Sequence, residues 1–158
     1  MPIPGYLATM ELGPAWQDLG LPGLFLAAFL AATILPFSSE ALLAVMALGP
    51  WSTWSLWICA SLGNTLGGLS SYGLGRLGDG RRLGRWFGAS PEKVDRVTDR
   101  VRRSGVWSAL LCWLPVIGDP IAIALGLFRA PVGPVSILMF VGKAARYAVV
   151  LVALRALV

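Results

Sequence analysis

Residues 21–49 read LPGLFLAAFLAATILPFSSEALLAVMALG, an apolar run that is interrupted at Pro36. Residues 106–128, VWSALLCWLPVIGDPIAIALGLF, are interrupted in the same way at Pro115. Proline breaks a helix, and at about 1.5 Å per residue the flanking pieces are too short to cross a hydrocarbon core of about 30 Å. We therefore predict two re-entrant helix–break–helix hairpins. A kinked spanning helix is the alternative reading of each run.

The whole chain has the composition of a membrane protein. Of its 158 residues, 56% are hydrophobic and 13% are charged, whereas soluble domains carry about 25% charged residues. Two further stretches, residues 51–75 and 131–154, are long enough to cross a membrane as single helices, which takes about 20 residues. The sequence therefore predicts an all-α polytopic membrane protein with a single membrane domain over residues 1–158, of which residues 1–20 form an N-terminal segment.

The two halves of the chain share one pattern. The first break, LPxxxE, ends at Glu40, and the second, LPxxxD, ends at Asp119, an offset of 79 residues (119 − 40). The same offset places Asn64 on Lys143, in the middle of the two long stretches. Two matches at a single offset indicate an internal duplication.

Each predicted repeat is a hairpin followed by a transmembrane helix, over residues 21–75 and 106–154. One spanning helix per repeat gives the second repeat the opposite orientation, which is the inverted-topology architecture of many secondary transporters. The segment between the repeats, residues 76–105, carries nine basic and four acidic residues. The positive-inside rule makes it cytoplasmic. Within it, residues 91–104 are predicted to form an amphipathic helix on the membrane surface.

Two acids lie inside the apolar segments, Glu40 and Asp119. Ionisable residues within a membrane are costly and mark functional sites. Both acids follow a helix break, next to freed backbone groups, so we expect them to carry protons or to act as a gate. The alternative is that they form structural salt bridges with the two bases of the last long stretch.

Those two bases, Lys143 and Arg146, lie three residues apart and therefore on one face of the last predicted helix. Asn64 lies in the middle of the first long stretch, and Arg129 lies just before the second. We expect these four residues to bind an anionic group such as a lipid phosphate, which makes membrane lipids and protons the expected partners.

A stripe of small residues runs along the first long stretch at four-residue spacing, formed by Gly63, Gly67, Ser71 and Gly75. Such a stripe lets another helix approach closely. It either packs against the hairpins of the same chain or forms a homodimer interface.

Other functional classes are disfavoured. The chain has no histidine, which removes Ser-His-Asp and Cys-His catalysis, and it has no G-x-S-x-G, phosphate-binding loop or zinc motif. We expect no enzymatic activity, no cofactor and no metal. The arginines of residues 76–103 alternate with acids and lack a nucleic-acid-binding motif, so no nucleic acid is expected as a partner.

The chain resembles the DedA family of membrane proteins, also described as the SNARE-associated or VTT-domain family. Residues 35–40, LPFSSE, are similar to that family's proline-rich hairpin ending in Ser-Glu, and residues 67–76, GGLSSYGLGR, are similar to its G-x-x-x-x-Y-x-x-G-R motif. In the second hairpin, Cys112 and Gly118 stand where the main branch has the arginines of R-F-x-P-G-x-R. This departure resembles the shorter YqaA-like subgroup.

The resemblance implies inverted re-entrant repeats, a bacterial inner-membrane location, and the translocation or scrambling of lipids. It makes Glu40 the essential acid. The remaining residues that it assigns to family motifs are Pro36, Gly68, Tyr72, Gly75, Arg76 and Pro115.

The sequence therefore predicts a transporter-like protein that translocates or scrambles an anionic lipid or lipid phosphate, coupled to protons through Glu40 and Asp119. One alternative is a proton-coupled carrier of a small solute, which needs an aqueous vestibule but no path open to the bilayer. A second alternative is a non-transporting scaffold that assembles other membrane proteins. In a scaffold, neutralising the two acids would have no effect.

Overall fold

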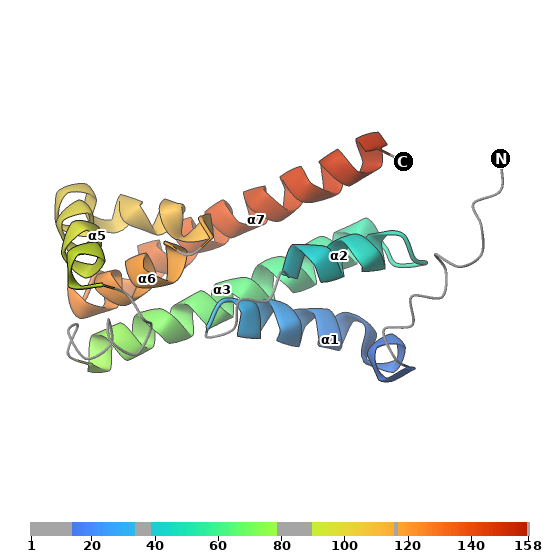
Figure 1. The fold of residues 1–158 in the computed structure, drawn as a ribbon, viewed down its shortest axis with the longest axis horizontal. Helices are drawn as coiled ribbons and strands as arrows, with labels where there is room; N and C mark the ends of the chain where they lie inside the picture. Colours follow the sequence, from blue (N-terminus) through green and yellow to red (C-terminus); the bar gives the residue numbers. More distant parts are fainter. Residues whose placement is uncertain (1–13, 34–38, 79–89, 116, 158) are drawn as a thin grey trace.

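The computed structural model of the chain describes residues 14–33, 39–78, 90–115 and 117–157 (Figure 1). All regular structure in these residues is helical, which confirms the predicted class. The elements are α1 (Pro14–Ala31), α2 (Ser39–Ala47), α3 (Thr53–Leu77), α5 (Pro91–Ser104), the 3-10 helix η1 (Gly105–Trp113), α6 (Gly118–Leu127) and α7 (Val132–Leu157). Pro36 and most of the first break, with residues 1–13 of the N-terminal segment, lie outside the described residues.

Two long helices and four short ones make up the apolar part of the described residues. Helices α3 and α7 have 25 and 26 residues, whereas α2, η1 and α6 have 9, 9 and 10. Helix α1 is kinked at Gly20, where φ is 45°, so its apolar arm is the piece Gly20–Ala31. None of these short pieces reaches the roughly 30 Å of a hydrocarbon core. The order short helix, break, short helix, long helix occurs twice, at α1–α2–α3 and at η1–α6–α7.

One helix among the described residues, Val132–Ala156, is both long enough and apolar enough to cross a membrane. Helix α3 is as long but richer in glycine, serine, threonine and asparagine, which lowers its hydropathy. Most of its small and polar residues, such as Asn64, Thr65 and Ser71, are buried against other helices of the chain. A polar face that is covered by protein does not need lipid-facing apolar side chains.

The two long helices lie side by side and run in opposite directions (Figure 1). At one end the Arg155 guanidinium donates a hydrogen bond to the Thr53 hydroxyl at 2.6 Å, and at the other the Tyr72 hydroxyl donates to the Ala130 carbonyl at 2.6 Å. Helix α1 packs on α3 as η1 packs on α7; α6 packs extensively on α3, whereas α2 makes a smaller contact that it shares equally between α3 and α7. Each long helix therefore contacts arms from both halves of the chain.

The small-residue stripe of α3 is used inside the chain. Added Cβ atoms at Gly63 and Gly67 would collide with the carbonyl oxygens of Phe25 and Phe29 on α1. On the same stripe, Gly75 lies against Ile123 of α6 in the same way. All four stripe residues are buried, so the stripe is an intramolecular packing surface, and a homodimer would need another face.

The second half repeats this close approach. An added Cβ at Gly142 of α7 would lie 2.6 Å from the carbonyl oxygen of Leu110 on η1. Gly142 follows Gly63 by 79 residues (142 − 63), the offset between the two breaks. In both halves, then, a glycine at the same position of the long helix lets the first arm of a hairpin approach.

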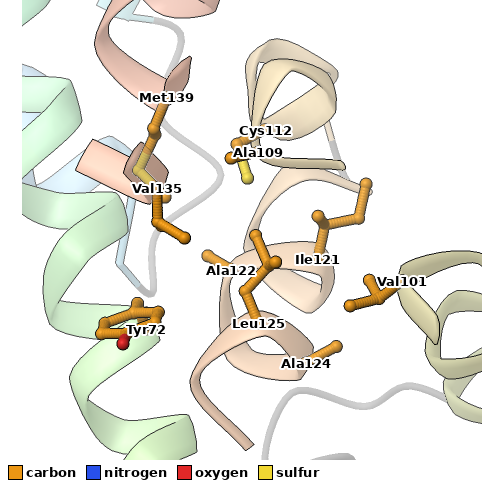
Figure 2. Packing of buried hydrophobic residues seen from close by; sticks show 10 residues of the cluster. All are labelled: Tyr72, Val101, Ala109, Cys112, Ile121, Ala122, Ala124, Leu125, Val135 and Met139. Atoms are coloured by element: carbon orange, nitrogen blue, oxygen red, sulfur yellow. The ribbon is translucent and has the colours of Figure 1, made fainter. Parts of the chain in front are cut away.

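Two apolar clusters fill the interior. The first packs α3, α6, η1 and α7 around Tyr72, Leu125, Val135 and Met139, and Val101 of α5 joins it (Figure 2). The second packs α1, α2, α3 and α7, and consists of Leu24, Leu43, Leu56, Ala60, Tyr147 and Leu151. Along α3 and α7 the clusters are separated by Asn64 and Lys143, which places polar groups between them.

Candidate functional site

A single guanidinium group connects the two breaks. Arg146, on α7, forms a salt bridge with Glu40, which lies in the first turn of α2 directly after the first break. The same side chain donates a hydrogen bond to the Trp113 carbonyl at 2.8 Å, at the end of η1 where the second break begins. Charge-assisted hydrogen bonds of this kind are about twice as strong as neutral ones. Arg146 therefore joins a residue that follows the first break to a residue that precedes the second.

A second polar contact lies three residues earlier on α7. Lys143 is only 2% exposed, and its ammonium group donates to the Asn64 carbonyl oxygen at 2.6 Å. The side-chain amide of Asn64 in turn donates to the Ala28 carbonyl at 3.0 Å. Helices α7, α3 and α1 are thereby joined through the two residues that the 79-residue offset made equivalent.

The Lys143 ammonium group is enclosed closely. An added Cβ at Gly68 would lie 2.8 Å from the Lys143 Nζ atom and 2.7 Å from the Met139 sulfur. Gly68 is one of the residues that the family resemblance singled out, and its missing side chain makes room for the ammonium group. The structure thus gives Gly68, which directly follows the first glycine of the G-x-x-x-x-Y-x-x-G-R motif, a physical reason that its sequence position alone did not.

In the part of the chain that the structure describes, the acid of the second break has no such partner. Asp119, in the first turn of α6, is half-buried, and no hydrogen bond or ion pair to its carboxylate is present among the described residues. Lys143 is near enough to interact with it electrostatically, but not in contact. The alternative that the four charges pair off as salt bridges therefore holds for Glu40 and Arg146 and not for Asp119 and Lys143.

Arg129 lies away from the polar centre that is formed by Glu40, Arg146, Lys143 and Asn64. It is exposed in the link between α6 and α7, where its φ is 51°. Its neighbours there are Tyr72 and Arg76, because the Tyr72 hydroxyl bonds both the Ala130 carbonyl and, at 3.0 Å, the Arg76 guanidinium. The structure brings Asn64, Lys143, Arg146 and Glu40 together between the two clusters and places Arg129 at one end of the molecule.

The remaining motif residues pack helices together. Gly75 of α3 lies against Ile123, and Gly126 of α6 lies against the backbone of Tyr72, so the two helices are in mutual close contact. Pro115 is exposed in the second break, and its carbonyl accepts a hydrogen bond from the Ile117 amide at 2.8 Å.

Two hydrogen bonds at the polar centre are made by side chains that were not singled out in the sequence. The Ser39 and Tyr147 hydroxyls share a buried hydrogen bond of 2.7 Å, which ties the start of α2 to α7 beside the salt bridge. The Trp57 indole donates to the Ala144 carbonyl at 2.8 Å. Tyr147 follows Arg146 directly, and a polar tyrosine next to an intramembrane arginine is the signal that could have found it.

Comparison with known proteins identifies relatives of the chain. The VTT domain model matches residues 35–156. The chain is 39% identical over 135 residues to the "Inner membrane protein YqaA" of Escherichia coli (strain K12), a match that covers 85% of this chain and 90% of that protein. The Shigella flexneri protein of the same name gives the same values. An "Uncharacterized protein" of Haemophilus influenzae is 33% identical over 147 residues, with 86% and 88% of the two chains covered. No solved structure matches the chain.

Proposed function

Because the chain belongs to the DedA (VTT-domain) family of membrane proteins, we propose that it translocates or scrambles an anionic lipid or lipid phosphate across the bacterial inner membrane, coupled to protons. The observation that carries this proposal is the position of Arg146, which bonds Glu40 at one break and the Trp113 carbonyl at the other. An intramembrane cation that holds two breaks together is suited both to bind a phosphate and to control whether the breaks separate.

The proposed architecture is two inverted repeats, each a re-entrant hairpin and a spanning helix, with residues 76–105 on the cytoplasmic side. Its support is the antiparallel arrangement of α3 and α7 and the reciprocal packing of the hairpin arms on them. The contact between the equivalent residues Asn64 and Lys143 is a further point in favour, because a twofold relation between repeats brings such positions together at its axis.

In the proposed mechanism, the phosphate competes with Glu40 for Arg146. When Glu40 takes up a proton it loses the charge that holds Arg146, and the guanidinium becomes available to an anion. Release of the proton restores the salt bridge and displaces the phosphate. Asp119 and Lys143 form a second acid and base beside the other break, which is the expected location for a second stage of proton and anion exchange.

The test is lipid translocation by purified protein in liposomes that contain headgroup-labelled phosphatidylglycerol, with and without a pH gradient. Glu40→Gln and Asp119→Asn are compared with wild type, and Glu92→Gln, which removes one carboxylate from the exposed surface of α5, is the matched control. We expect fast flipping in wild type and control, faster still with the gradient, and loss of flipping in both acid variants.

Two results would contradict the proposal. No flipping above that of empty liposomes, from folded protein and for several headgroups, would favour a carrier of a small solute. Unchanged in vivo function of both acid variants at normal protein levels would favour a scaffold.

A further inference from the structure

Helix α6 ends with an arginine where glycine is usual. The Ala130 amide bonds the Leu125 carbonyl at 3.0 Å, and the Arg129 amide bonds the Gly126 carbonyl at 2.9 Å. These two bonds form a Schellman motif, in which Arg129 takes the left-handed position with φ of 51°. A side chain strains the backbone at that position, so glycine is the favoured residue. A residue that remains there in spite of the strain is a candidate for function.

A second arginine is fixed beside the same turn. The Arg76 guanidinium donates to the Tyr72 hydroxyl at 3.0 Å, and that hydroxyl donates to the Ala130 carbonyl at 2.6 Å. The Tyr72 side chain is 4% exposed, so the phenol is a rigid support, whereas Arg76 itself is exposed. The Tyr72 hydroxyl therefore holds Arg76 next to the turn that carries Arg129.

Among the described residues, neither arginine has an acidic partner. In the described ranges of the chain the salt bridge between Glu40 and Arg146 is the one present, so Arg76 and Arg129 form none there. Helix α5 packs on α6 at the same end of the molecule (Figure 1) and carries five basic and three acidic residues, so it adds a net positive charge there. This end of the molecule consequently has uncompensated positive charge that favours an anion.

Exposed apolar side chains adjoin both arginines. Leu77 follows Arg76 and is 90% exposed, and Phe128 precedes Arg129 and is 41% exposed. Cations beside exposed apolar groups are typical of the boundary between lipid headgroups and acyl chains. A lipid fits this combination better than a free phosphate ion does, because its acyl chains cover the apolar residues while its phosphate meets the guanidinium groups.

We propose that Arg76 and Arg129 bind the phosphate group of an anionic membrane lipid, and that Tyr72 is the residue that positions Arg76. Guanidinium groups suit this role because their planar donors match phosphate oxygens. The inference rests on the proposed function at one point only, namely that the lipid bound by Arg76 and Arg129 is also the lipid that is translocated. On that view the lipid docks at the α5 end of the molecule before its phosphate reaches Arg146.

The test measures lipid binding and not transport. Native mass spectrometry of the full chain in detergent gives the dissociation constants of phosphatidic acid and of diacylglycerol, which differ only in the phosphate group. Arg129→Gly is the most informative variant, since glycine suits the turn and the backbone strain is relieved. Arg76→Gln and Tyr72→Phe are measured beside it. Arg155→Gln is the matched control, because it removes one positive charge at the opposite end of α7.

We expect Arg129→Gly and Arg76→Gln each to weaken phosphatidic acid binding about tenfold, Tyr72→Phe to weaken it less, and Arg155→Gln to leave it unchanged. Diacylglycerol binding should be weak and equal in all of them. Unaltered phosphatidic acid binding by both arginine variants would overturn the proposal, and so would full displacement of phosphatidic acid by equimolar inorganic phosphate, which would indicate a site for the free ion.

This experiment separates the two proposals. Arginine-dependent binding of phosphatidic acid by a protein that does not flip lipids would support the docking site and contradict the proposed function. Lipid flipping by a protein whose Arg76 and Arg129 variants bind phosphatidic acid normally would overturn the docking site alone.

Discussion

The two breaks carry equivalent acids in different surroundings. Glu40 forms a salt bridge with Arg146 of α7, whereas the carboxylate of Asp119 has no ion pair in the part of the chain that the structure describes. The reason lies on α3. Gly67 precedes Arg146 by 79 residues (146 − 67) and so takes the equivalent place on the first long helix. An added Cβ there would collide with the Phe29 carbonyl, so α1 has no room for an arginine at that position.

The difference shows how close packing gives two acids at corresponding sequence positions different surroundings. The position on α7 holds a cation, and the position on α3 is used for helix contact. Glu40 is consequently held in an ion pair, whereas the carboxylate of Asp119 has none among the described residues. Four substitutions test this comparison, from the largest expected effect to the smallest.

Arg146→Gln should have the largest effect on stability. It leaves Glu40 without its cation and the Trp113 carbonyl without its donor. Removing one partner of a fully buried ion pair costs about 3 to 5 kcal/mol. Both side chains here are partly exposed, at 21% and 28%, so we expect a loss of about 2 kcal/mol in the free energy of unfolding.

Chemical unfolding in detergent measures that loss. The double variant Glu40→Gln/Arg146→Gln should recover part of it, because no unpaired charge remains. A double variant as unstable as the sum of the two single losses would show that the two residues do not act as a pair.

Gly67→Ala should be the next most harmful change, with a loss of about 1.5 kcal/mol, because the new methyl group would overlap the Phe29 carbonyl. Gly73→Ala on the same helix is the matched control. Apart from its own stretch of helix, nothing lies within 4 Å of its added Cβ, so the better helix propensity of alanine should stabilise the protein by about 0.5 to 1 kcal/mol. Equal thermal midpoints of the two variants would contradict the proposed packing of α1 on α3.

Lys143→Met should change the free energy of unfolding by no more than about 1 kcal/mol. The ammonium group is buried and has no contacting carboxylate among the described residues, so an apolar side chain of similar length relieves its desolvation. Lipid flipping should fall nonetheless, since the variant has lost a cation of the centre. A large loss of stability would instead make Lys143 a structural residue.

Asp119→Asn should have the smallest effect on stability, within about 0.5 kcal/mol, because no ion pair or hydrogen bond of the described structure is lost. Glu40→Gln should destabilise the protein more than this. Unfolding curves of the two variants under the same conditions make the comparison direct, and an Asp119→Asn variant less stable than Glu40→Gln would reverse the assignment of roles.

Local signals in the sequence predicted the elements well. Proline in the two apolar runs gave the positions of the short helices, and α5 occupies residues 91–104, where an amphipathic helix is predicted. The 3-10 geometry of η1 was not predicted, because the apolar run 106–114 has no feature that separates it from an α-helix.

The contacts of the charges were harder to predict. Lys143 and Arg146 lie on one face of a helix, so spacing could not decide which of them reaches Glu40. Their partners depend on how α2 and η1 fold against α7, which is a tertiary property. For the same reason Arg129 was grouped with the central bases, although the α6–α7 turn places it near Tyr72 and Arg76.

The central claim is that Glu40 and Arg146 act as one link between the two hairpin tips during lipid translocation. Flipping rates of Glu40→Gln, Arg146→Gln and the double variant, in liposomes with a pH gradient, test it most directly. We predict that each single variant loses most of the flipping rate. The double variant should be no slower than either single variant, because the loss of one partner already breaks the ion pair and the second substitution removes no further interaction. Single variants that flip lipids like wild type, or a double variant in which two partial losses multiply, would contradict the account.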